Sequence, residues 1–320
     1  MRRHVAPHQR GGAAAAAVER ALEVVERRVV PHAALALQRV GIGKAGGMGA
    51  NLRTGHAVQV RTDAVGPARS DGVAGRALGE ALLPLGGITD HGGRFHGWNR
   101  SADLAVEALK AQGQAFTGVP WFAAGHSFGG VLTSLIVAEQ PKLFQSAVLL
   151  DPVLFTPSML LGASVAELTG VMRHTPLARQ ARGRRDHWAS RDEARANLTG
   201  RGTYKGWADE AMDAFLTHAL ADAEGGVRLK CRPSREAEIF GSMPDRLWSL
   251  LARVRTPVHV LHAEHTFPFV GESVARWSNL NDHVSAEQVH GGHCFMQEHP
   301  ADAARLVAAQ LLPRLDVVSA

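Results

Sequence analysis

A short motif around Ser127 carries the clearest chemistry in this 320-residue sequence. Residues 125–129 read Gly-His-Ser-Phe-Gly, and G-x-S-x-G is typical of a nucleophilic serine when it stands between a strand and a helix. An apolar run predicts a buried strand over 119–124, and a helix is expected over 129–140, closed by Pro141. Such a sharp turn strains the backbone at the serine and requires glycine at the flanking positions. We therefore expect the Ser127 hydroxyl to stand exposed above a sheet.

The elements that would position this serine follow an alternating pattern. Further buried strands are expected over 144–150, 256–262 and 283–289, and amphipathic helices over 102–111 and 300–312. Strands that alternate with helices predict an α/β fold with a mostly parallel central sheet and helices on both faces.

In this setting the motif resembles the α/β-hydrolase superfamily, in particular its cap-bearing serine esterase and lipase-like members, from about residue 95 to the C-terminus. The resemblance implies a catalytic histidine after the last strand, in a G-x-H segment followed by Glu and then Pro. His293 fits this place, between Gly291 and Glu298. A histidine suits the task because its ordinary pKa near 6.5 lets it take up and return a proton near neutral pH.

The acid of the expected Ser-His-Asp triad departs from the usual pattern. Relatives commonly place Asp on the loop after the seventh strand, where this sequence has Thr266. Some relatives use the end of the strand that follows the nucleophile helix, and Asp151 occupies that place. Glu264 is the alternative acid. Asp151 could instead belong to a simple Asp-Pro turn at a strand end.

The oxyanion hole is only half visible in the sequence. The Phe128 backbone N–H should be one donor, because it follows the nucleophile at a helix N-terminus. The second donor usually lies in an upstream His-Gly loop, but the segments at His91 and His96 stand too close to Ser127. They look instead like a degraded form of the family's Asp-x-x-Gly-His-Gly segment, with Asp90 leading.

The chain divides into segments of different composition. Residues 1–90 contain no Phe, Trp or Tyr and are rich in Ala and Gly, which leaves little volume for a packed core. They predict a poorly ordered or incomplete front half of the sheet, with a helix over 13–30 and a strand over 56–62. Residues 91–155 and 241–320 should form the α/β-hydrolase core, and 156–240 a helical cap.

Several other patterns invite weaker interpretations. Gly41, Gly43 and Gly46 match G-x-G-x-x-G but favour a flexible turn over a nucleotide loop. The histidines at 259, 262 and 265 have a spacing that alternates faces on a strand, which argues against zinc. The arginines of 182–185 favour a solvated face, with an anionic-substrate clamp as the lesser alternative. An apolar acyl pocket could be lined by Met159, Leu160, Leu161, Trp188, Trp207, Phe215 and Phe267.

Composition limits the possible partners. The net charge of +5 is spread over a large chain, so nucleic-acid binding is not indicated. No apolar run is long enough for a signal peptide or a membrane span, and two cysteines cannot build a disulfide framework. We expect a cytoplasmic protein. The oligomeric state cannot be deduced.

The sequence thus predicts a serine hydrolase that cleaves a carboxylic ester of a small or medium apolar acid without a cofactor or metal. Ser127, His293 and Asp151 would form the triad, with Phe128 at the oxyanion. Lactone opening, C–C bond hydrolysis and acyl transfer use the same triad and stay open. A catalytically impaired relative with an incomplete N-terminal half is the alternative function.

Overall fold

The centre of the protein is a four-stranded parallel sheet. The computed structural model describes residues 95–112, 121–168 and 171–311. The sheet has the order β1-β2-β6-β7, with bounds β1 (Phe122–His126), β2 (Ser146–Leu150), β6 (Val258–His265) and β7 (Val284–Gly292). These strands match the four predicted runs in type and order, with ends shifted by up to three residues. The predicted α/β fold is confirmed.

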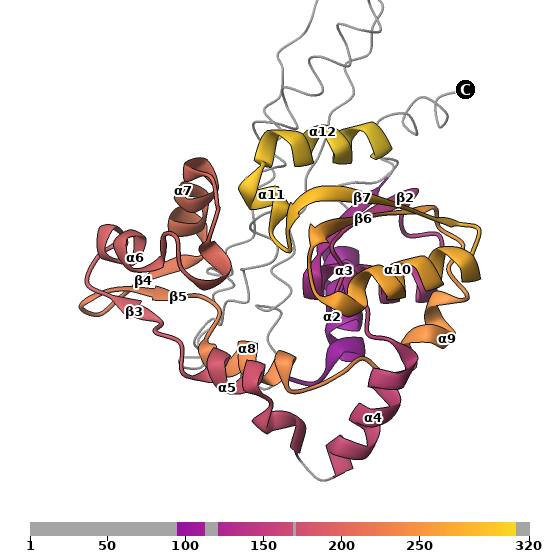
Figure 1. Ribbon diagram of the computed structural model, residues 1–320, viewed down its shortest axis with the longest axis horizontal. Coiled ribbons are helices and arrows are strands. Elements are labelled where there is room, and N and C mark those ends of the chain that lie inside the picture. Colours follow the sequence, from indigo (N-terminus) through magenta and orange to yellow (C-terminus); the bar gives the residue numbers. More distant parts are fainter. Residues whose placement is uncertain (1–94, 113–120, 169–170, 312–320) are drawn as a thin grey trace, which may run out of the picture.

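Helices cover both faces of this sheet (Figure 1). Successive side chains of a strand point to opposite faces, so Ala147 and Leu149 of β2 lie on one side and Val148 and Leu150 on the other. The first side packs on α2 (Trp98–Gln112), α3 (Ser127–Glu139), α9 (Leu247–Leu251) and α10 (Pro268–Leu280). The second packs on α11 (Phe295–Glu298) and α12 (Pro300–Leu311).

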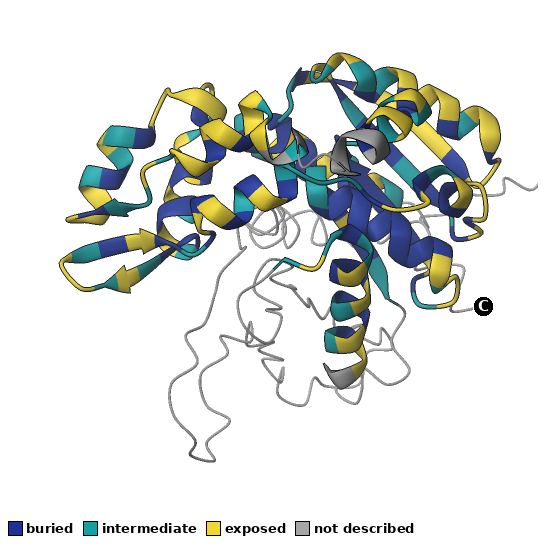
Figure 2. Cartoon of the chain, turned by 90° about the horizontal axis from the view of Figure 1, so that it is seen from below, coloured by how far each residue is buried: buried dark blue, intermediate teal, exposed yellow. Residues whose placement is uncertain are grey.

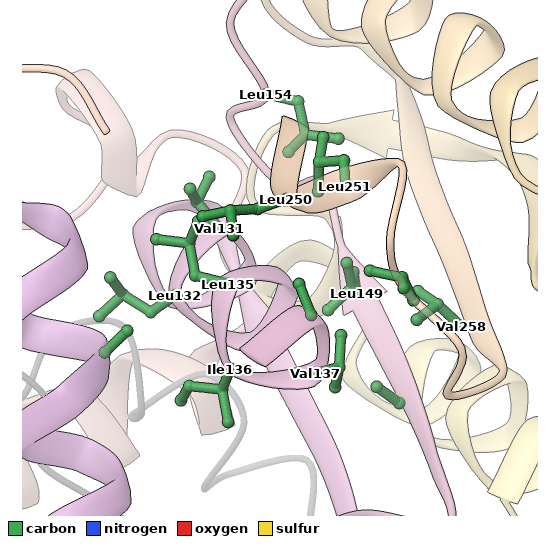
Figure 3. Close-up of a cluster of buried hydrophobic side chains, with 14 of the residues drawn as sticks. Val131, Leu132, Leu135, Ile136, Val137, Leu149, Leu154, Leu250, Leu251 and Val258 are labelled. Carbon is green, nitrogen blue, oxygen red and sulfur yellow. The ribbon is translucent and has the colours of Figure 1, made fainter. Parts of the chain in front are cut away.

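Helix α3 is the most deeply buried helix around the sheet. Residues 129–138 are all buried, which suits a helix that is apolar on every side. Figure 3 shows its side chains against β2 and α9, including Val131, Leu135, Leu149 and Leu250. Burying each such side chain contributes about 1.5–3 kcal/mol, so packing holds α3 firmly beneath the turn at Ser127.

The segment between β2 and α9, where a helical cap over 156–240 is predicted, is mainly helical. It contains α4 (Pro157–Leu168), η2 (Val171–His174), α5 (Pro176–Arg182), α6 (Arg191–Leu198), η3 (Gly202–Tyr204), α7 (Asp209–His218) and α8 (Pro233–Phe240). It also holds a three-stranded antiparallel sheet, order β3-β5-β4, that the sequence did not predict: β3 (His187–Trp188), β4 (Leu220–Ala223) and β5 (Gly226–Leu229). We call residues 156–240 the inserted segment.

The inserted segment has a small core of its own, apart from that of the central sheet. Trp188 is fully buried there and packs with Phe215 and Leu220. Figure 2 shows that buried residues occur in the inserted segment as well as around the central sheet. Part of the apolar surface of the inserted segment is therefore buried within the segment itself, without contact with the central sheet.

The expected helix over 13–30, the strand over 56–62 and the glycine-rich turn at 41–46 lie outside the described residues, as does the whole atypical segment 1–90. Within the described ranges, no helix combines the length and the apolar character needed to cross a membrane.

Candidate active site

Ser127 stands at the turn between β1 and α3. Strand β1 ends at His126 and α3 begins at Ser127, two residues earlier than the sequence predicted. The serine has φ 51°, in the left-handed region. Among the described non-glycine residues, only Ser127, Asp151 and Arg246 have positive φ. Such conformations cost on the order of 1–3 kcal/mol each and gather at functional sites, and two of the three belong to the predicted triad.

Two glycines around this turn have no room for a side chain. A Cβ on Gly125 would lie 2.5 Å from both the Gly129 carbonyl oxygen and the Thr133 hydroxyl. A Cβ on Gly130 would lie 2.9 Å from Pro152 Cβ. The glycines therefore let the helix approach the strand ends closely, which brings the serine beside the residues that follow β2.

His293 is carried by a loop between β7 and α11. Gly291 has φ 117°, a conformation that favours glycine, and the Gly292 N–H donates to Glu298 Oε2 at 2.8 Å. Glu298, five residues after the histidine, thus fixes the start of the loop through its hydrogen bond to Gly292. The inserted segment touches this loop and the helix after it: Thr203 Oγ1 lies 3.5 Å from Cys294 Sγ in the loop, and the Ala208 N–H donates to the Gln297 carbonyl in α11 at 2.8 Å.

The three side chains predicted from the sequence meet in one hydrogen-bonded row. His293 Nε2 lies 3.0 Å from Ser127 Oγ, and His293 Nδ1 lies 2.5 Å from Asp151 Oδ2. A carboxylate oxygen only accepts, so Nδ1 carries the proton and Nε2 faces the serine with its lone pair. This arrangement can draw a proton from the hydroxyl.

Asp151 is fully buried at the end of β2, where its φ is 43°. It is more than an Asp-Pro turn, because its carboxylate binds three donors. The Ala263 N–H donates to Oδ1 at 2.8 Å, and the Thr266 hydroxyl donates to Oδ2. Thr266, at the usual acid position, therefore supports an acid on the neighbouring strand. This role of Thr266 was not predicted from the sequence, because it depends on β2 and β6 being neighbours in the sheet.

The other acid candidate points elsewhere. Glu264 is exposed near the end of β6, and Oε2 lies 3.2 Å from Nδ1 of His290, a neighbouring surface histidine. The hydrogen bonds of the site therefore join His293 to Asp151.

Phe128 lies at the second position of α3, where a backbone N–H has no partner within the helix. Its position therefore leaves this N–H without an intrahelical acceptor, as an oxyanion donor requires. Of the upstream candidates, Asp90 and His91 lie outside the described residues, and His96 is exposed in the loop before α2.

Aromatic rings form a continuous arc from the nucleophile to the base. Phe128 contacts Trp98 with ring centroids 4.6 Å apart, and Trp98 contacts Phe155 at 5.7 Å. Phe155 continues to Phe269 at 5.8 Å, and Phe269 to Phe267 at 5.7 Å. Phe267 then meets the His293 ring edge-on at 5.0 Å. Aromatic rings thus adjoin both the nucleophile, through Phe128, and the base candidate, through Phe267.

The expected lining residues separate into two groups. Met159, Leu160 and Phe267 pack on the central core, and Leu161 is exposed. Trp188, Phe215 and Trp207 instead form the core of the inserted segment.

Arg184, Arg185 and His259, from the arginine and histidine patterns singled out in the sequence, each contact another side chain. Arg184 pairs with Glu236, and Arg185 with Glu193. His259 hydrogen-bonds Ser285 at 2.8 Å. In the part of the chain that is described, no three His, Cys, Asp or Glu side chains are grouped to hold a metal ion.

Comparisons with known proteins agree with this architecture. The solved structure of E-2-(acetamidomethylene)succinate hydrolase is similar, with a TM-score of 0.53 and 19% identity over 69% of this chain and 75% of that one. The peroxisomal α/β-hydrolase Lpx1 from Saccharomyces cerevisiae gives 0.53 and 15% identity, over 71% and 63%. No curated protein matches the sequence significantly. The alpha/beta hydrolase family matches residues 47–306. The chain therefore belongs to the alpha/beta hydrolase family.

Proposed function

We propose that this protein is a serine hydrolase that cleaves a carboxylic ester of a small or medium apolar acid. The observation that carries the proposal is the unbroken row from Ser127 Oγ to His293 Nε2, at 3.0 Å, and from His293 Nδ1 to Asp151, at 2.5 Å. Nucleophile, base and orienting acid within hydrogen-bond reach are the requirement for serine catalysis.

The reaction would follow two steps. Ser127 Oγ attacks the carbonyl carbon while its proton passes to His293 Nε2, which gives a tetrahedral intermediate. The ester C–O bond then breaks, and the Nε2 proton goes to the leaving alkoxide. Water, deprotonated by His293, hydrolyses the acyl-enzyme and returns the serine. Asp151 stays ionised throughout and stabilises the imidazolium.

The substrate class rests on the surroundings of the triad. The Phe128 N–H would hold the oxyanion, and the partly buried rings of Phe128 and Phe267 at the two ends of the aromatic arc would contact the apolar acyl group. The inserted segment would act as a cap, since its loop at 203–208 contacts the histidine loop. Its arginines 184 and 185 are paired with glutamates, which disfavours an anionic-substrate clamp there.

A fluorophosphonate probe with a panel of p-nitrophenyl esters of increasing acyl length tests the proposal. We expect labelling at Ser127 and turnover that favours short and medium acyl chains. The Ser127→Ala variant should lose both while keeping its melting temperature within about 3 °C, because removing one hydroxyl from a half-buried side chain takes away little packing. Turnover that persists in this variant would exclude the serine mechanism. An unlabelled wild type would favour the catalytically impaired relative.

The two cysteines will not confuse this test. Burial raises the pKa of Cys231 to about 12 and that of Cys294 to about 11, so neither thiol ionises appreciably near neutral pH. Both are free thiols, which favours the cytoplasmic location that forms part of this proposal.

A further inference from the structure

His126, the residue before the nucleophile, is buried and touches the catalytic histidine. Its side chain ends β1 and is 4% exposed. Its Nε2 lies 2.7 Å from the backbone carbonyl oxygen of His293, a residue 167 positions away in the chain. The two rings also pack together, with centroids 4.6 Å apart. The proposed mechanism gives His126 no role in proton transfer.

The hydrogen bond fixes the tautomer of His126. A carbonyl oxygen only accepts, so Nε2 must carry the proton and donate. Nδ1 is then a bare acceptor, and it finds no hydrogen-bond partner among the described residues. Nδ1 therefore does not hold the side chain in place. Within the described residues, the only hydrogen bond of the His126 side chain is the one to the His293 carbonyl.

The topology explains why His293 needs such a bond. Strands β1 and β7 lie at opposite ends of the order β1-β2-β6-β7, so the loop after β7 must reach back across the strand ends to approach Ser127. Glu298 holds this loop near Gly292, and Asp151 holds the imidazole ring. Among the described residues, His126 is the one next to the proposed nucleophile whose side chain donates a hydrogen bond to the backbone carbonyl of His293.

His126 also stays neutral beside the base. Burial first, and then the positive charge of protonated His293, hold the pKa of His126 well below its ordinary value of 6.5. When His293 takes the serine proton, the adjoining ring therefore adds no second positive charge that would oppose the transfer.

We propose that His126 is a positioning residue that sets the separation of the Ser127 hydroxyl and the His293 imidazole by holding the His293 backbone carbonyl. The inference rests on the proposed serine hydrolase function. A displacement of about 1 Å between reacting groups can cost about a hundredfold in rate, so one such bond can control turnover without touching substrate. A buried histidine that merely packs would affect stability only.

The test compares variants that separate the ring from its N–H donor. His126→Phe keeps the ring volume and loses the donor, whereas His126→Gln loses the ring and keeps an N–H donor at a similar reach. We expect kcat on p-nitrophenyl butyrate and the rate of fluorophosphonate labelling to fall about a hundredfold in His126→Phe, with KM nearly unchanged. His126→Gln should keep kcat within about tenfold of wild type, because the donor is restored.

His259 offers a matched control, because it is another histidine on a core strand with a lowered pKa, caused mainly by burial. It bonds Ser285 and lies outside the proposed machinery. His259→Phe and His259→Gln should leave kcat unchanged even where the melting temperature drops. A His126→Phe variant with kcat within about threefold of wild type would overturn the proposal. An equal fall in His126→Phe and His126→Gln would do the same.

Should His126→Phe fail to fold, His126→Asn replaces it. Asn is one methylene shorter than Gln and cannot reach the His293 carbonyl, so we expect its kcat to lie about a hundredfold below that of His126→Gln. Equal kcat in these two variants would refute the positioning role. If wild type is not labelled at Ser127, the proposed function itself fails. If wild type is labelled and His126→Phe labels equally fast, only the role of His126 fails.

Discussion

A single carboxylate directly after β2 accepts the hydrogen bonds that orient the His293 imidazole, the base of the proposed mechanism. Asp151 is fully buried and accepts from His293, from the Ala263 N–H and from the Thr266 hydroxyl. A buried charge is tolerated when several donors satisfy it. The Asp151 carboxylate is therefore held rigidly enough to fix both the tautomer and the orientation of the imidazole.

Asp151→Asn should lower kcat on the order of 10⁴-fold while changing KM little. An amide keeps the shape of the side chain but removes the negative charge that stabilises the imidazolium. Steady-state kinetics on the best ester of the panel, with circular dichroism to verify folding, measure this effect.

Glu264→Gln is the companion variant, because it makes the same chemical change at the other acid candidate. Glu264 is exposed and pairs with His290, so we expect kcat to stay within about threefold of wild type. If Glu264→Gln proved the more damaging of the two, the acid would have to be reassigned to the end of β6.

The positive φ of Ser127 predicts that replacing this serine with glycine gives a more stable protein than replacing it with alanine. Glycine adopts φ near 51° without penalty, whereas alanine does not. Ser127→Gly should therefore unfold at a higher denaturant concentration than Ser127→Ala, by about 1 kcal/mol in the free energy of unfolding. Urea titration of the two inactive variants decides the matter, and equal midpoints would mean that the turn is unstrained.

The ends of two neighbouring strands offer alternative places for the acid. Asp151 follows β2 and Thr266 follows β6, and the two side chains are hydrogen-bonded to each other. The double variant Asp151→Asn/Thr266→Asp moves the carboxylate from one strand end to the next. We expect it to recover at least about tenfold of the roughly 10⁴-fold loss in kcat of Asp151→Asn, because the new carboxylate starts within reach of the same cluster.

Thr266→Asp alone is the control for this exchange. It places two carboxylates together in a buried site, where repulsion keeps one of them protonated, so we expect no gain in kcat over wild type. A double variant as inactive as Asp151→Asn would show that only the end of β2 can orient His293.

The elements around the nucleophile are predictable from local sequence. Helix α3 and strand β2 are buried and carry a mainly apolar sequence, and the motif between β1 and α3 singles out Ser127 as the nucleophile candidate without any structure. Strands β3 to β5 were missed because they have two to four residues, too few for a period-two pattern. The residues of β4, Leu-Ala-Asp-Ala, read as a continuation of α7.

The residues that support the site could not be predicted in the same way. Thr266 acts on a carboxylate 115 positions away, and only the adjacency of β2 and β6 brings the two together. His126 acts on a backbone carbonyl, and a carbonyl leaves no trace in residue types. Sequence patterns report which side chains can react, but long-range pairing decides which side chains hold them in place.

For the molecule as a whole, the buried neutral His126 makes stability depend on pH. Because burial lowers the pKa of His126 in the folded state, the unfolded chain binds one more proton below about pH 6.5. The free energy of unfolding therefore falls as the pH falls below that value. The contribution of this residue is at most about 1.4 kcal/mol per pH unit.

Melting temperatures of wild type and His126→Gln between pH 7.5 and 5 measure this term. The wild-type curve should fall more steeply on acidification than the curve of His126→Gln, because only the wild type must protonate a buried histidine on unfolding. His259 contributes in the same direction in both proteins and cancels in the comparison. Parallel curves would mean that His126 is protonated in the folded protein as readily as in the unfolded chain.

The contacts between the inserted segment and the residues after His293 limit which parts of this chain can be exchanged with those of a related protein. Ala208 donates to Gln297 and Thr203 touches Cys294, so residues just beyond the base are held by a part of the chain that lies outside the central sheet. Residues 156–240 therefore cannot be exchanged independently of the rest of the chain. A chimera that takes these residues from another member of the family would acquire different cap side chains near the proposed substrate site. It would also lose the contacts of Thr203 and Ala208 with the residues after His293. Residues 294–298 would have to be transplanted together with them for turnover to survive the exchange.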